Sequence, residues 1–443
     1  MYEIFKAYDI RGIYPSELDE QIARRIGRAF VSALGSKKVI VGRDCRISSP
    51  KLAAALIEGI LEQGADVIDI GLCSTPMIYF ASQSADAIMV TASHNPKEYN
   101  GFKLCKKGGI RIAQKSGISK IEQIFKQGKF VPVAKAKGKH FKRHLLPSYV
   151  FHVLKFARGI KKLKLVVDGG NGMAGLTFPA IARRLPCKVI PLCFKLDGNF
   201  PNHPPNPFLT GVLKELQERV VKEGADLGIA FDADCDRVAF VDEKGKIARG
   251  DLIALLIARD ILKRKAGAKI FCDVRCSRVV EEEIKRLGGR FERSKVGHAF
   301  IANKMRKEDA EFAGELSEHY YFKENFYCDS GDIAVIHMLN ILSEEKKPLS
   351  AMIKPFQRYY QSGELSFEAS QQVAKRIVSV LVEIYSSGRQ SRLDGLTVEY
   401  KDWWFNIRPS HTEAMIRLNV EAKTKKLLDK RLEEIKKHIL GNI

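Results

Sequence analysis

The feature of the sequence that most restricts its fold is a regular alternation of short apolar runs with longer helical stretches. Residues 38–42 are typical of a strand that ends in a glycine, and residues 50–63 are typical of a helix with one apolar face. Residues 66–70 and 87–90 are two further expected strands. Strands separated by helices indicate βαβ units with a mainly parallel sheet. The first part of the chain is therefore predicted to form an α/β domain.

The same alternation returns twice, and the pattern then changes. Further strands are expected at 164–168, 188–193, 227–231 and 269–273, and helices at 251–263 and 277–287. After about residue 360 the order becomes a helix at 368–387, short strands at 396–400, 403–408 and 415–420, and a final helix, which is an α+β pattern. We predict three similar mixed-sheet α/β domains plus a C-terminal α+β domain. The expected domains are 1–142, 143–246, 247–355 and 356–443, with linkers near 135–142, 242–250 and 346–355.

Bulk properties narrow the class of protein. The longest apolar runs, such as residues 252–258, are far shorter than the roughly 18 residues of a membrane helix, and the N-terminus has no apolar leader. We therefore expect a cytoplasmic protein with no membrane partner. The net charge of +22 favours anionic partners, which could be phosphorylated metabolites, nucleic acid or acidic membrane surfaces. Because Lys and Arg are spread along the whole chain, solvated surfaces explain them better than nucleic-acid binding does. The nine cysteines form no C-x-x-C pair, which favours reduced, mostly buried thiols.

A candidate nucleophile follows the expected strand at 87–90. Residues 91–96 read Thr-Ala-Ser-His-Asn-Pro, which places Ser93 and His94 at a strand end. In parallel α/β sheets, functional groups lie at the carboxyl ends of strands, and a hydroxyl beside an imidazole suits an exposed nucleophile. A plain turn is the alternative, because Ser, Asn and Pro are common in turns. Lys103 follows ten residues later and adds a cation.

A second candidate site is a loop with three alternating carboxylates, Asp232, Asp234 and Asp236, between two apolar runs. Three like charges this close repel one another unless a cation neutralises them, and oxygen ligands suit Mg²⁺ or Ca²⁺. An EF-hand is excluded because Arg237 occupies the sixth position, where glycine is needed, and strands flank the loop. Arg237 beside a divalent cation indicates a phosphate ligand.

Two further loops carry weaker signals. Residues 314–319 present polar groups at alternate positions, which suits vicinal sugar hydroxyls, although a surface loop is equally compatible. Arg408 with Ser410 and Thr412 makes a good phosphate pocket. The glycine-rich turn at 169–172 lacks the lysine of a P-loop and is interpreted as a packing feature. The four sites fall in four different predicted domains, which indicates one central cleft. Together they fit phosphoryl transfer on a phosphosugar.

These segments together resemble the α-D-phosphohexomutase superfamily, and most closely its phosphomannomutase/phosphoglucomutase branch. The matching segments occur in the family's order along nearly the whole chain: 5–12, 91–96, 100–103, 232–237, 295–298, 314–319 and 408–412. The resemblance implies Mg²⁺-dependent interconversion of hexose 6-phosphate and hexose 1-phosphate, of mannose and/or glucose. It also implies a phosphoserine enzyme and a hexose 1,6-bisphosphate that acts as intermediate and activator. The partner would be a hexose phosphate, with a monomer and a homodimer both possible.

The resemblance also implies residue roles. Ser93 would carry the phosphoryl group, and Asp232, Asp234 and Asp236 would hold Mg²⁺ with the Ser93 phosphate. Lys103 and His298 are candidates for acid–base work. The implied catalytic set is Ser93, Lys103, His298, His94 and Arg11. The implied substrate-binding set is Tyr8, Arg237, Arg275, Lys295, Gly297, Glu315, Ser317, His319, Arg408, Ser410, His411 and Thr412.

Three departures from the family's pattern stand out. Glu318 replaces the usual glycine of the sugar loop, His411 and Ala414 replace Asn and Pro in the phosphate loop, and Arg275 stands where Lys is frequent. Three alternatives remain: phosphoglucosamine mutase, against which Leu316 argues, a metal-dependent phosphatase, and a non-catalytic basic binding protein on a mutase fold.

Overall fold

The computed structural model describes residues 4–132, 136–410 and 414–441. Its first domain, domain 1, is built on a sheet of order β1-β5-β4-β2-β3-β7, with β6 beside β5. Strands β4, β2, β3 and β7 are parallel, β5 is antiparallel to its neighbour β4, and β1 is antiparallel to β5. The strands are β1 (Ile10–Ile13), β2 (Lys38–Arg43), β3 (Asp66–Leu72), β4 (Asp86–Val90), β5 (Tyr99–Lys106), β6 (Ile110–Arg111) and β7 (His140–Lys142). The helices are α1 (Glu20–Leu34), α2 (Ser49–Glu62), α3 (Thr75–Ala81), the 3₁₀ turn η1 (Gln114–Ser116) and α4 (Ile118–Gln127).

Both faces of this sheet are covered by hydrophobic cores, and successive side chains of the central strand β2 point alternately into one core and the other. Val39 and Val41 belong to a core shared with α1, α2 and α4, whereas Ile40 belongs to the core that contains α3. Successive side chains of a strand point to opposite faces. The face covered by α3 is the one through which domain 1 packs against domains 2 and 3, because α3 contacts α5 and β17.

Domains 2 and 3 repeat the mixed-sheet plan. The sheet of domain 2 has the order β12-β11-β10-β8-β9, and that of domain 3 has the order β14-β13-β15-β16-β17. Domain 2 comprises α5 (Leu146–Leu154), β8 (Lys164–Asp168), α6 (Ala174–Ala182), β9 (Lys188–Leu192), α7 (Lys214–Glu223), β10 (Leu227–Phe231), β11 (Val238–Val241) and β12 (Ile247–Ala248). Domain 3 comprises α8 (Gly250–Arg264), β13 (Lys269–Asp273), α9 (Arg278–Arg286), β14 (Arg290–Ser294), α10 (His298–Glu308), β15 (Phe312–Gly314), β16 (Tyr320–Phe322), η2 (Lys323–Asn325), β17 (Cys328–Asp329), α11 (Gly331–Glu345), α12 (Leu349–Ile353) and η3 (Lys354–Phe356).

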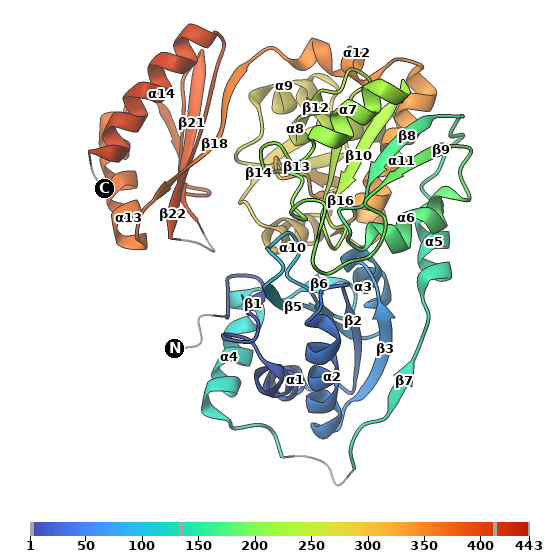
Figure 1. The fold of residues 1–443 in the computed structure, drawn as a ribbon. Helices are drawn as coiled ribbons and strands as arrows, with labels where there is room; N and C mark the ends of the chain where they lie inside the picture. The colour runs from blue at the N-terminus through green and yellow to red at the C-terminus, as the bar shows by residue number, and fades with distance from the viewer. Residues whose placement is uncertain (1–3, 133–135, 411–413, 442–443) are drawn as a thin grey trace.

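Domain 4 is an antiparallel sheet of order β18-β22-β21-β20-β19 covered by two helices. Its elements are β18 (Tyr360–Glu368), α13 (Gln371–Ile384), β19 (Arg389–Ser391), β20 (Leu396–Glu399), β21 (Trp403–Pro409), β22 (Met415–Ala422) and α14 (Lys425–Leu440). It has a hydrophobic core of its own, whereas one continuous core joins domains 1, 2 and 3. Figure 1 shows domain 4, in orange and red, beside the body formed by the other three.

The predicted fold class is confirmed, with three mixed-sheet α/β domains and a C-terminal α+β domain. The expected linkers are wrong in part. Residues 140–142 form β7, which extends the first sheet beside β3, and β12 forms a hairpin with β11 inside the second expected linker. Helix α12 lies in the third. These elements are two to five residues long, too short to show a periodic pattern. Among the described residues, no helix is both long and apolar enough to cross a membrane.

Candidate active site

The Ser93 loop is shaped by a buried arginine, Arg46, in the loop that follows the neighbouring strand β2. Ser93 follows β4 with a left-handed backbone, φ +50°, and is 3% exposed. The fully buried Arg46 donates from Nη2 to the carbonyls of Ser93 and Asn95, at 2.6 and 2.7 Å, and from Nη1 to that of Pro96 at 2.6 Å. Arg46 also pairs with Asp44. Left-handed backbone in a non-glycine residue is unfavourable and needs such support. Arg46 therefore fixes the direction in which the Ser93 hydroxyl points.

The three carboxylates of the metal loop face this hydroxyl. Asp232, Asp234 and Asp236 lie in the β10–β11 turn, and their ligand atoms are within 4.8 Å of one another. The Ser93 Oγ donates to Asp232 Oδ2 at 3.0 Å. Lys103, on β5, lies 2.6 Å from Asp234 Oδ2 and also pairs with Asp236. The nucleophile of one domain and the carboxylates of another thus meet in one place.

These carboxylates fit a divalent cation. All three are buried, and the Oδ1 atoms of Asp234 and Asp236 have no hydrogen-bond partner among the described residues. Burial and repulsion from Asp236 and Asp234 raise the pKa of Asp232 to about 7. A carboxylate raised in this way is stabilised in its charged form by a nearby cation. The oxygen-only donor set suits Mg²⁺.

Two arginines contact the Ser93 loop, which also contains a neutral histidine. Arg237 donates from Nη2 to Ser93 Oγ at 3.2 Å and to His94 Nδ1, and its Nε lies 3.1 Å from Asp232. Burial and the neighbouring Arg237 and Arg11 hold the pKa of His94 well below its usual value. Arg11 reaches the same loop and donates to Asn95 Oδ1 at 2.6 Å. His94 is therefore a neutral imidazole.

His298 is the first residue of α10 and points into the same region. Arg111 Nη1 lies 2.9 Å from His298 Nδ1, and Tyr8 stacks edge-on against the ring with centroids 4.8 Å apart. Burial and the nearby Arg111 and Lys103 hold the pKa of His298 well below its usual value. Since a guanidinium only donates, Nδ1 must accept, and the proton of the neutral ring is on Nε2. His298 is thus set up as a hydrogen-bond donor through Nε2.

The sugar-loop residues form a charged cluster with His319 at its centre. His319 Nδ1 lies 2.7 Å from Glu315 Oε2, and its Nε2 lies 3.5 Å from Asp236. Burial lowers the pKa of His319, but its contacts with Asp236 and Glu315 outweigh burial and raise it to about 9. Glu315 also accepts from the backbone of Gly297 at 2.9 Å, and Ser317 contacts Glu315 at 3.3 Å. The imidazolium therefore connects the sugar loop to the metal loop.

Glu318 occupies a position whose backbone conformation suits glycine. Its backbone is left-handed, φ +66°, and its side chain is buried with Oε2 unpartnered among the described residues. Glycine adopts this conformation without strain. Burial raises the pKa of Glu318 well above its usual value. The side chain is therefore held as a neutral carboxylic acid.

The fourth site centres on Glu364, a residue that the sequence did not indicate. Glu364 Oε2 accepts from Arg408 at 2.9 Å and from Arg275 at 3.3 Å, and Oε1 lies 3.3 Å from Arg417. Arg275 also makes two contacts with Asp273, at 3.0 and 2.9 Å, and one with Ser317 at 3.0 Å. Arg275 thus joins domain 3 to domain 4. Ser410 is buried at the end of β21, and His411 and Thr412 lie outside the described residues.

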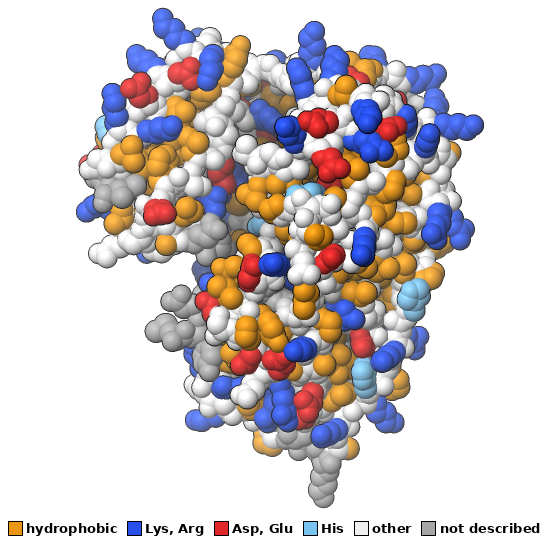
Figure 2. All heavy atoms as spheres, viewed as in Figure 1, with side chains coloured by type: hydrophobic (Ala, Val, Ile, Leu, Met, Phe, Trp, Pro, Cys, Tyr) orange, Lys and Arg blue, Asp and Glu red, His pale blue; other side chains and the backbone are white. Residues whose placement is uncertain are grey.

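A hollow of about 410 Å³ opens where domains 1, 3 and 4 meet, and Lys295 and Ser410 both line it. Its other lining residues are Ala7, Gln114, Gln371, Arg392, Leu393, Asp394, Gly395 and Pro409. Figure 2 shows the molecule indented on this side, between the C-terminal and N-terminal domains.

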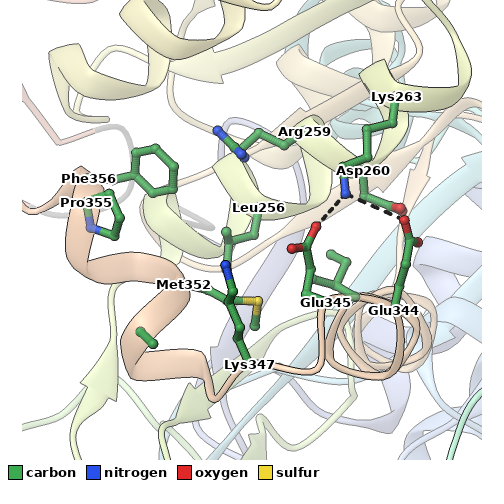
Figure 3. Close-up of a pocket in the computed structure, with 12 residues that line it drawn as sticks. Leu256, Arg259, Asp260, Lys263, Glu344, Glu345, Lys347, Met352, Pro355 and Phe356 are labelled. Carbon is green, nitrogen blue, oxygen red and sulfur yellow. Dashed lines mark hydrogen bonds and ion pairs between the residues drawn. The ribbon is translucent and has the colours of Figure 1, made fainter.

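A smaller cavity of about 150 Å³ lies beside α8, α11 and α12, where Lys263 pairs with Glu344 and Glu345 (Figure 3). Its lining includes none of the predicted site residues.

Several buried groups of the site give no sequence signal. Arg46 and Arg111 are two among 74 basic residues, and Thr75, which lies 2.5 Å from Asp234 Oδ2, stands at an ordinary helix start. Their partners lie 47 to 218 residues away along the chain. Only the tertiary structure reveals such pairs.

Comparison with known proteins covers the whole chain. Models of the phosphoglucomutase/phosphomannomutase family match domain I at residues 2–132, domain II at 147–245, domain III at 249–359 and the C-terminal domain at 361–438. The phosphomannomutase of Methanocaldococcus jannaschii is 40% identical over 440 residues, which are 98% of this chain and 96% of that protein.

Two solved structures extend the comparison. A phosphoglucomutase/phosphomannomutase family protein from Burkholderia thailandensis has a TM-score of 0.92 at 32% identity, covering 100% of this chain and 98% of its own. The N-acetylphosphoglucosamine mutase of Aspergillus fumigatus, in complex with GlcNAc-6P and magnesium, shares the fold with a TM-score of 0.63 at 13% identity, covering 98% of this chain and 94% of its own. With all four domains matched in order and the sequence similarity running from end to end, the chain belongs to the phosphoglucomutase/phosphomannomutase family.

Proposed function

We propose that this protein is a Mg²⁺-dependent phosphohexomutase that interconverts the 1-phosphate and 6-phosphate of mannose and/or glucose through phosphorylated Ser93. The observation that carries the proposal is the contact of the Ser93 hydroxyl with Asp232 at 3.0 Å and with Arg237 at 3.2 Å. A hydroxyl between a carboxylate cluster and a guanidinium suits a phosphoryl group that is held by a cation and an arginine. The family membership supports the same reaction class.

The metal would be held by Asp232, Asp234 and Asp236, together with an oxygen of the Ser93 phosphate. When bound, Mg²⁺ would neutralise the charge that develops on the transferring phosphoryl group. Lys103 and Arg237 add fixed positive charge at the same place. Burial lowers the pKa of Lys103, but Asp234 and Asp236 raise it overall, so Lys103 stays protonated and acts as a cation. His298, with its proton on Nε2, donates a hydrogen bond to the sugar or its phosphate.

The reaction then has two transfers. In the first, the bond between phosphorus and Ser93 Oγ breaks, a bond forms to the free sugar hydroxyl, and the proton of that hydroxyl ends on Ser93 Oγ. The product is a hexose 1,6-bisphosphate. It turns over in the cleft, the bond between its other phosphorus and the sugar oxygen breaks, that phosphoryl group returns to Ser93 Oγ, and the proton of Ser93 passes to the sugar oxygen. Each orientation needs a grip on the phosphate that is not reacting.

Binding of the sugar phosphate is assigned to domains 3 and 4. Glu315 and Ser317 would accept and donate hydrogen bonds at the ring hydroxyls, and Lys295 lies on the wall of the hollow. Arg408 and Ser410, with His411 and Thr412, would hold the remote phosphate. The separate core of domain 4 allows it to adjust to both orientations of the intermediate.

The test is ³¹P NMR of purified protein with mannose, glucose or glucosamine 1-phosphate, Mg²⁺ and a trace of the matching bisphosphate. We expect conversion of the mannose or glucose ester to its 6-phosphate with negligible inorganic phosphate. Lys103→Met should lower kcat by about 10²- to 10³-fold, because a fixed charge at the transferring group is lost. The control Lys107→Met, at an exposed position after β5, should retain activity.

Other outcomes of this experiment would replace the proposal. Steady release of inorganic phosphate would show a phosphatase, and faster turnover of the glucosamine ester would show a phosphoglucosamine mutase. No turnover of any ester by folded protein would favour a non-catalytic binding protein.

A further inference from the structure

A second group of metal-ligating side chains lies in domain 2, apart from the three carboxylates of the metal loop. Asp168, Cys193 and His203 bring their ligand atoms within 4.8 Å of one another. Asp168 ends β8, Cys193 follows β9, and His203 comes from the loop after it. The cluster lies at the carboxyl edge of a parallel strand pair, where functional groups gather in α/β sheets. None of the three takes part in the reaction described above.

Hydrogen bonds to the backbone already orient two of these side chains. His203 Nδ1 lies 2.8 Å from the carbonyl of Pro204, and Asp168 Oδ1 accepts from the backbone of Gly170 at 2.8 Å. A carbonyl can only accept, so His203 Nδ1 carries a proton and Nε2 is the free ligand atom. Metal-binding histidines typically donate their other ring N–H to such a carbonyl, and metal-binding carboxylates are hydrogen-bonded in turn.

The contact between the two residues requires a positive charge. His203 Nε2 and Asp168 Oδ2 are 3.0 Å apart, and in the neutral tautomer both atoms would be acceptors. Either a proton or a metal ion must therefore lie between them.

The third side chain decides which metal suits the cluster. Cys193 has a left-handed backbone, φ +52°, and its carbonyl accepts from Asn171 at 2.8 Å. A sulfur, an imidazole and a carboxylate are a ligand set of zinc, whereas Mg²⁺ prefers oxygen alone. Zinc holds such ligands at about 2.0–2.3 Å and thus roughly 3–4 Å from one another. The ligand atoms here lie within 4.8 Å of one another, and those of His203 and Asp168 are 3.0 Å apart.

We propose that Asp168, Cys193 and His203 bind one thiophilic divalent cation of the Zn²⁺ class, with solvent as the fourth ligand. The half-buried positions of Cys193 and His203 leave that fourth side open to water. Binding displaces the proton between His203 and Asp168 and the proton of the Cys193 thiol. This inference does not rest on the proposed function, because none of the three residues contacts Ser93 or the predicted Mg²⁺ ligands.

The site is linked to the metal loop through strand pairing and a backbone hydrogen bond. Asp168 pairs with Ala230 across β8 and β10, and the backbone of Met173 donates to Ala233 at 2.7 Å. A cation bound in the folded state stabilises that state by mass action. Zn²⁺ should therefore raise the thermal midpoint even when Mg²⁺ saturates the other site.

Cobalt tests the proposal, because thiolate ligation gives Co²⁺ a sulfur-to-metal charge-transfer band that carboxylates cannot give. The full chain is titrated with Co²⁺ in excess Mg²⁺, and binding of one equivalent with this band is expected. Cys193→Ser should abolish the band and His203→Gln should weaken binding at least tenfold. The matched control Cys187→Ser changes another half-buried cysteine of domain 2 and should keep the band. Zn²⁺ should displace the Co²⁺ and raise the melting temperature of wild type and the control, but not of Cys193→Ser.

The proposal is overturned if wild-type protein shows no thiolate band. It is also overturned if the band persists in Cys193→Ser, since another cysteine would then be the ligand, or if His203→Gln binds Co²⁺ as tightly as wild type. Circular dichroism of each variant establishes that it is folded before titration, and the two variants provide independent tests.

Discussion

At the scale of single residues, the catalytic region concentrates buried charge and unfavourable backbone. Ser93, Cys235 and Glu318 all have left-handed backbones, at φ +50°, +65° and +66°. Each such residue costs on the order of 1 kcal/mol or more, and they cluster at functional sites because the surroundings hold them. Ser93 and Cys235 lie in the two loops that meet, and Glu318 directly precedes His319. Three of the ten non-glycine residues with left-handed backbone among the described residues thus lie in or beside the loops that form the site.

Replacing Glu318 by Gln should change how stability depends on pH. Burial raises the pKa of Glu318 well above its usual value, so the folded state binds a proton that the unfolded state releases. Its favourable contribution is complete below about pH 4, near the unfolded pKa, and is lost as pH rises through the folded-state pKa. The Gln variant lacks this loss. Thermal midpoints should therefore match wild type near pH 4 and exceed it at pH 8.

Parallel pH profiles for wild type and Glu318→Gln would contradict this account, because they would mean that Glu318 ionises freely in the folded protein. Glu368→Gln, at an exposed position of β18, is the control and should follow wild type.

Replacing Arg46 by Lys should impair catalysis far more than substrate binding. The guanidinium donates to three carbonyls of the Ser93 loop, and an ammonium cannot reach all of them from one position. Displacement of a nucleophile by about 1 Å can cost about a hundredfold in rate. We therefore expect kcat to fall by about 10- to 100-fold, while KM changes little. Arg25→Lys, at another packed arginine of domain 1, should leave kcat unchanged. A rise in KM alone for Arg46→Lys would refute the positioning role.

At the scale of elements, the prediction from sequence succeeded where hydrophobic runs are long. The strands at 164–168, 227–231 and 269–273 were predicted to the residue, because each is a buried apolar run that ends in an aspartate or is followed directly by one. β7 was missed because it has only three residues, all exposed at a sheet edge. Loops with unusual composition, such as 91–96 and 232–237, were identified as sites. Arg46, Arg111 and Glu364 were not, because their significance depends on partners that folding brings from distant parts of the chain.

Glu364 on β18 acts at this scale as a link between two domains. Its carboxylate contacts Arg275 of domain 3 and Arg408 and Arg417 of domain 4. Burial raises the pKa of Glu364, but the three arginines outweigh burial and lower it to about 2, so it stays charged. Without that charge the guanidiniums repel one another and Arg408 loses its orientation. Glu364→Gln should therefore raise KM for the hexose phosphate about tenfold, which corresponds to about 1.4 kcal/mol.

Steady-state kinetics of Glu364→Gln and of the exposed Glu368→Gln provide the comparison. An unchanged or lower KM for Glu364→Gln would show that the carboxylate competes with the substrate for Arg408 and does not orient it.

At the scale of the whole molecule, the site exists only because the domains assemble. Domains 1, 2 and 3 share one core, so the Ser93 loop and the metal loop are held together rigidly, whereas domain 4 has its own core. The positive charge is spread over the visible surface (Figure 2) and is not confined to the hollow. The rigid part thus carries the reacting groups, and the separate domain carries the predicted grip on the remote phosphate.

Removal of Mg²⁺ should lower the stability of the folded protein. Three buried carboxylates face Lys103 and Arg237, so a cation that binds them stabilises the folded state. Mg²⁺ at a hundredfold excess over its Kd should add about 2.7 kcal/mol, and chelation should reverse this. Thermal unfolding against Mg²⁺ concentration measures the effect. Asp234→Asn should abolish it and Glu215→Gln, on the exposed face of α7, should not. An equal shift in both variants would place the ion elsewhere.

The most direct test of the account is the covalent state of Ser93. Purified protein is incubated with Mg²⁺ and glucose 1,6-bisphosphate, and intact and peptide masses are compared with those of untreated protein and of Ser93→Ala. The account predicts one added phosphoryl group on the peptide that contains Ser93, none in Ser93→Ala, and a loss of turnover of at least about a thousandfold in that variant. Folded, Mg²⁺-bound protein that is never phosphorylated at Ser93, or that keeps its turnover after Ser93→Ala, would contradict it.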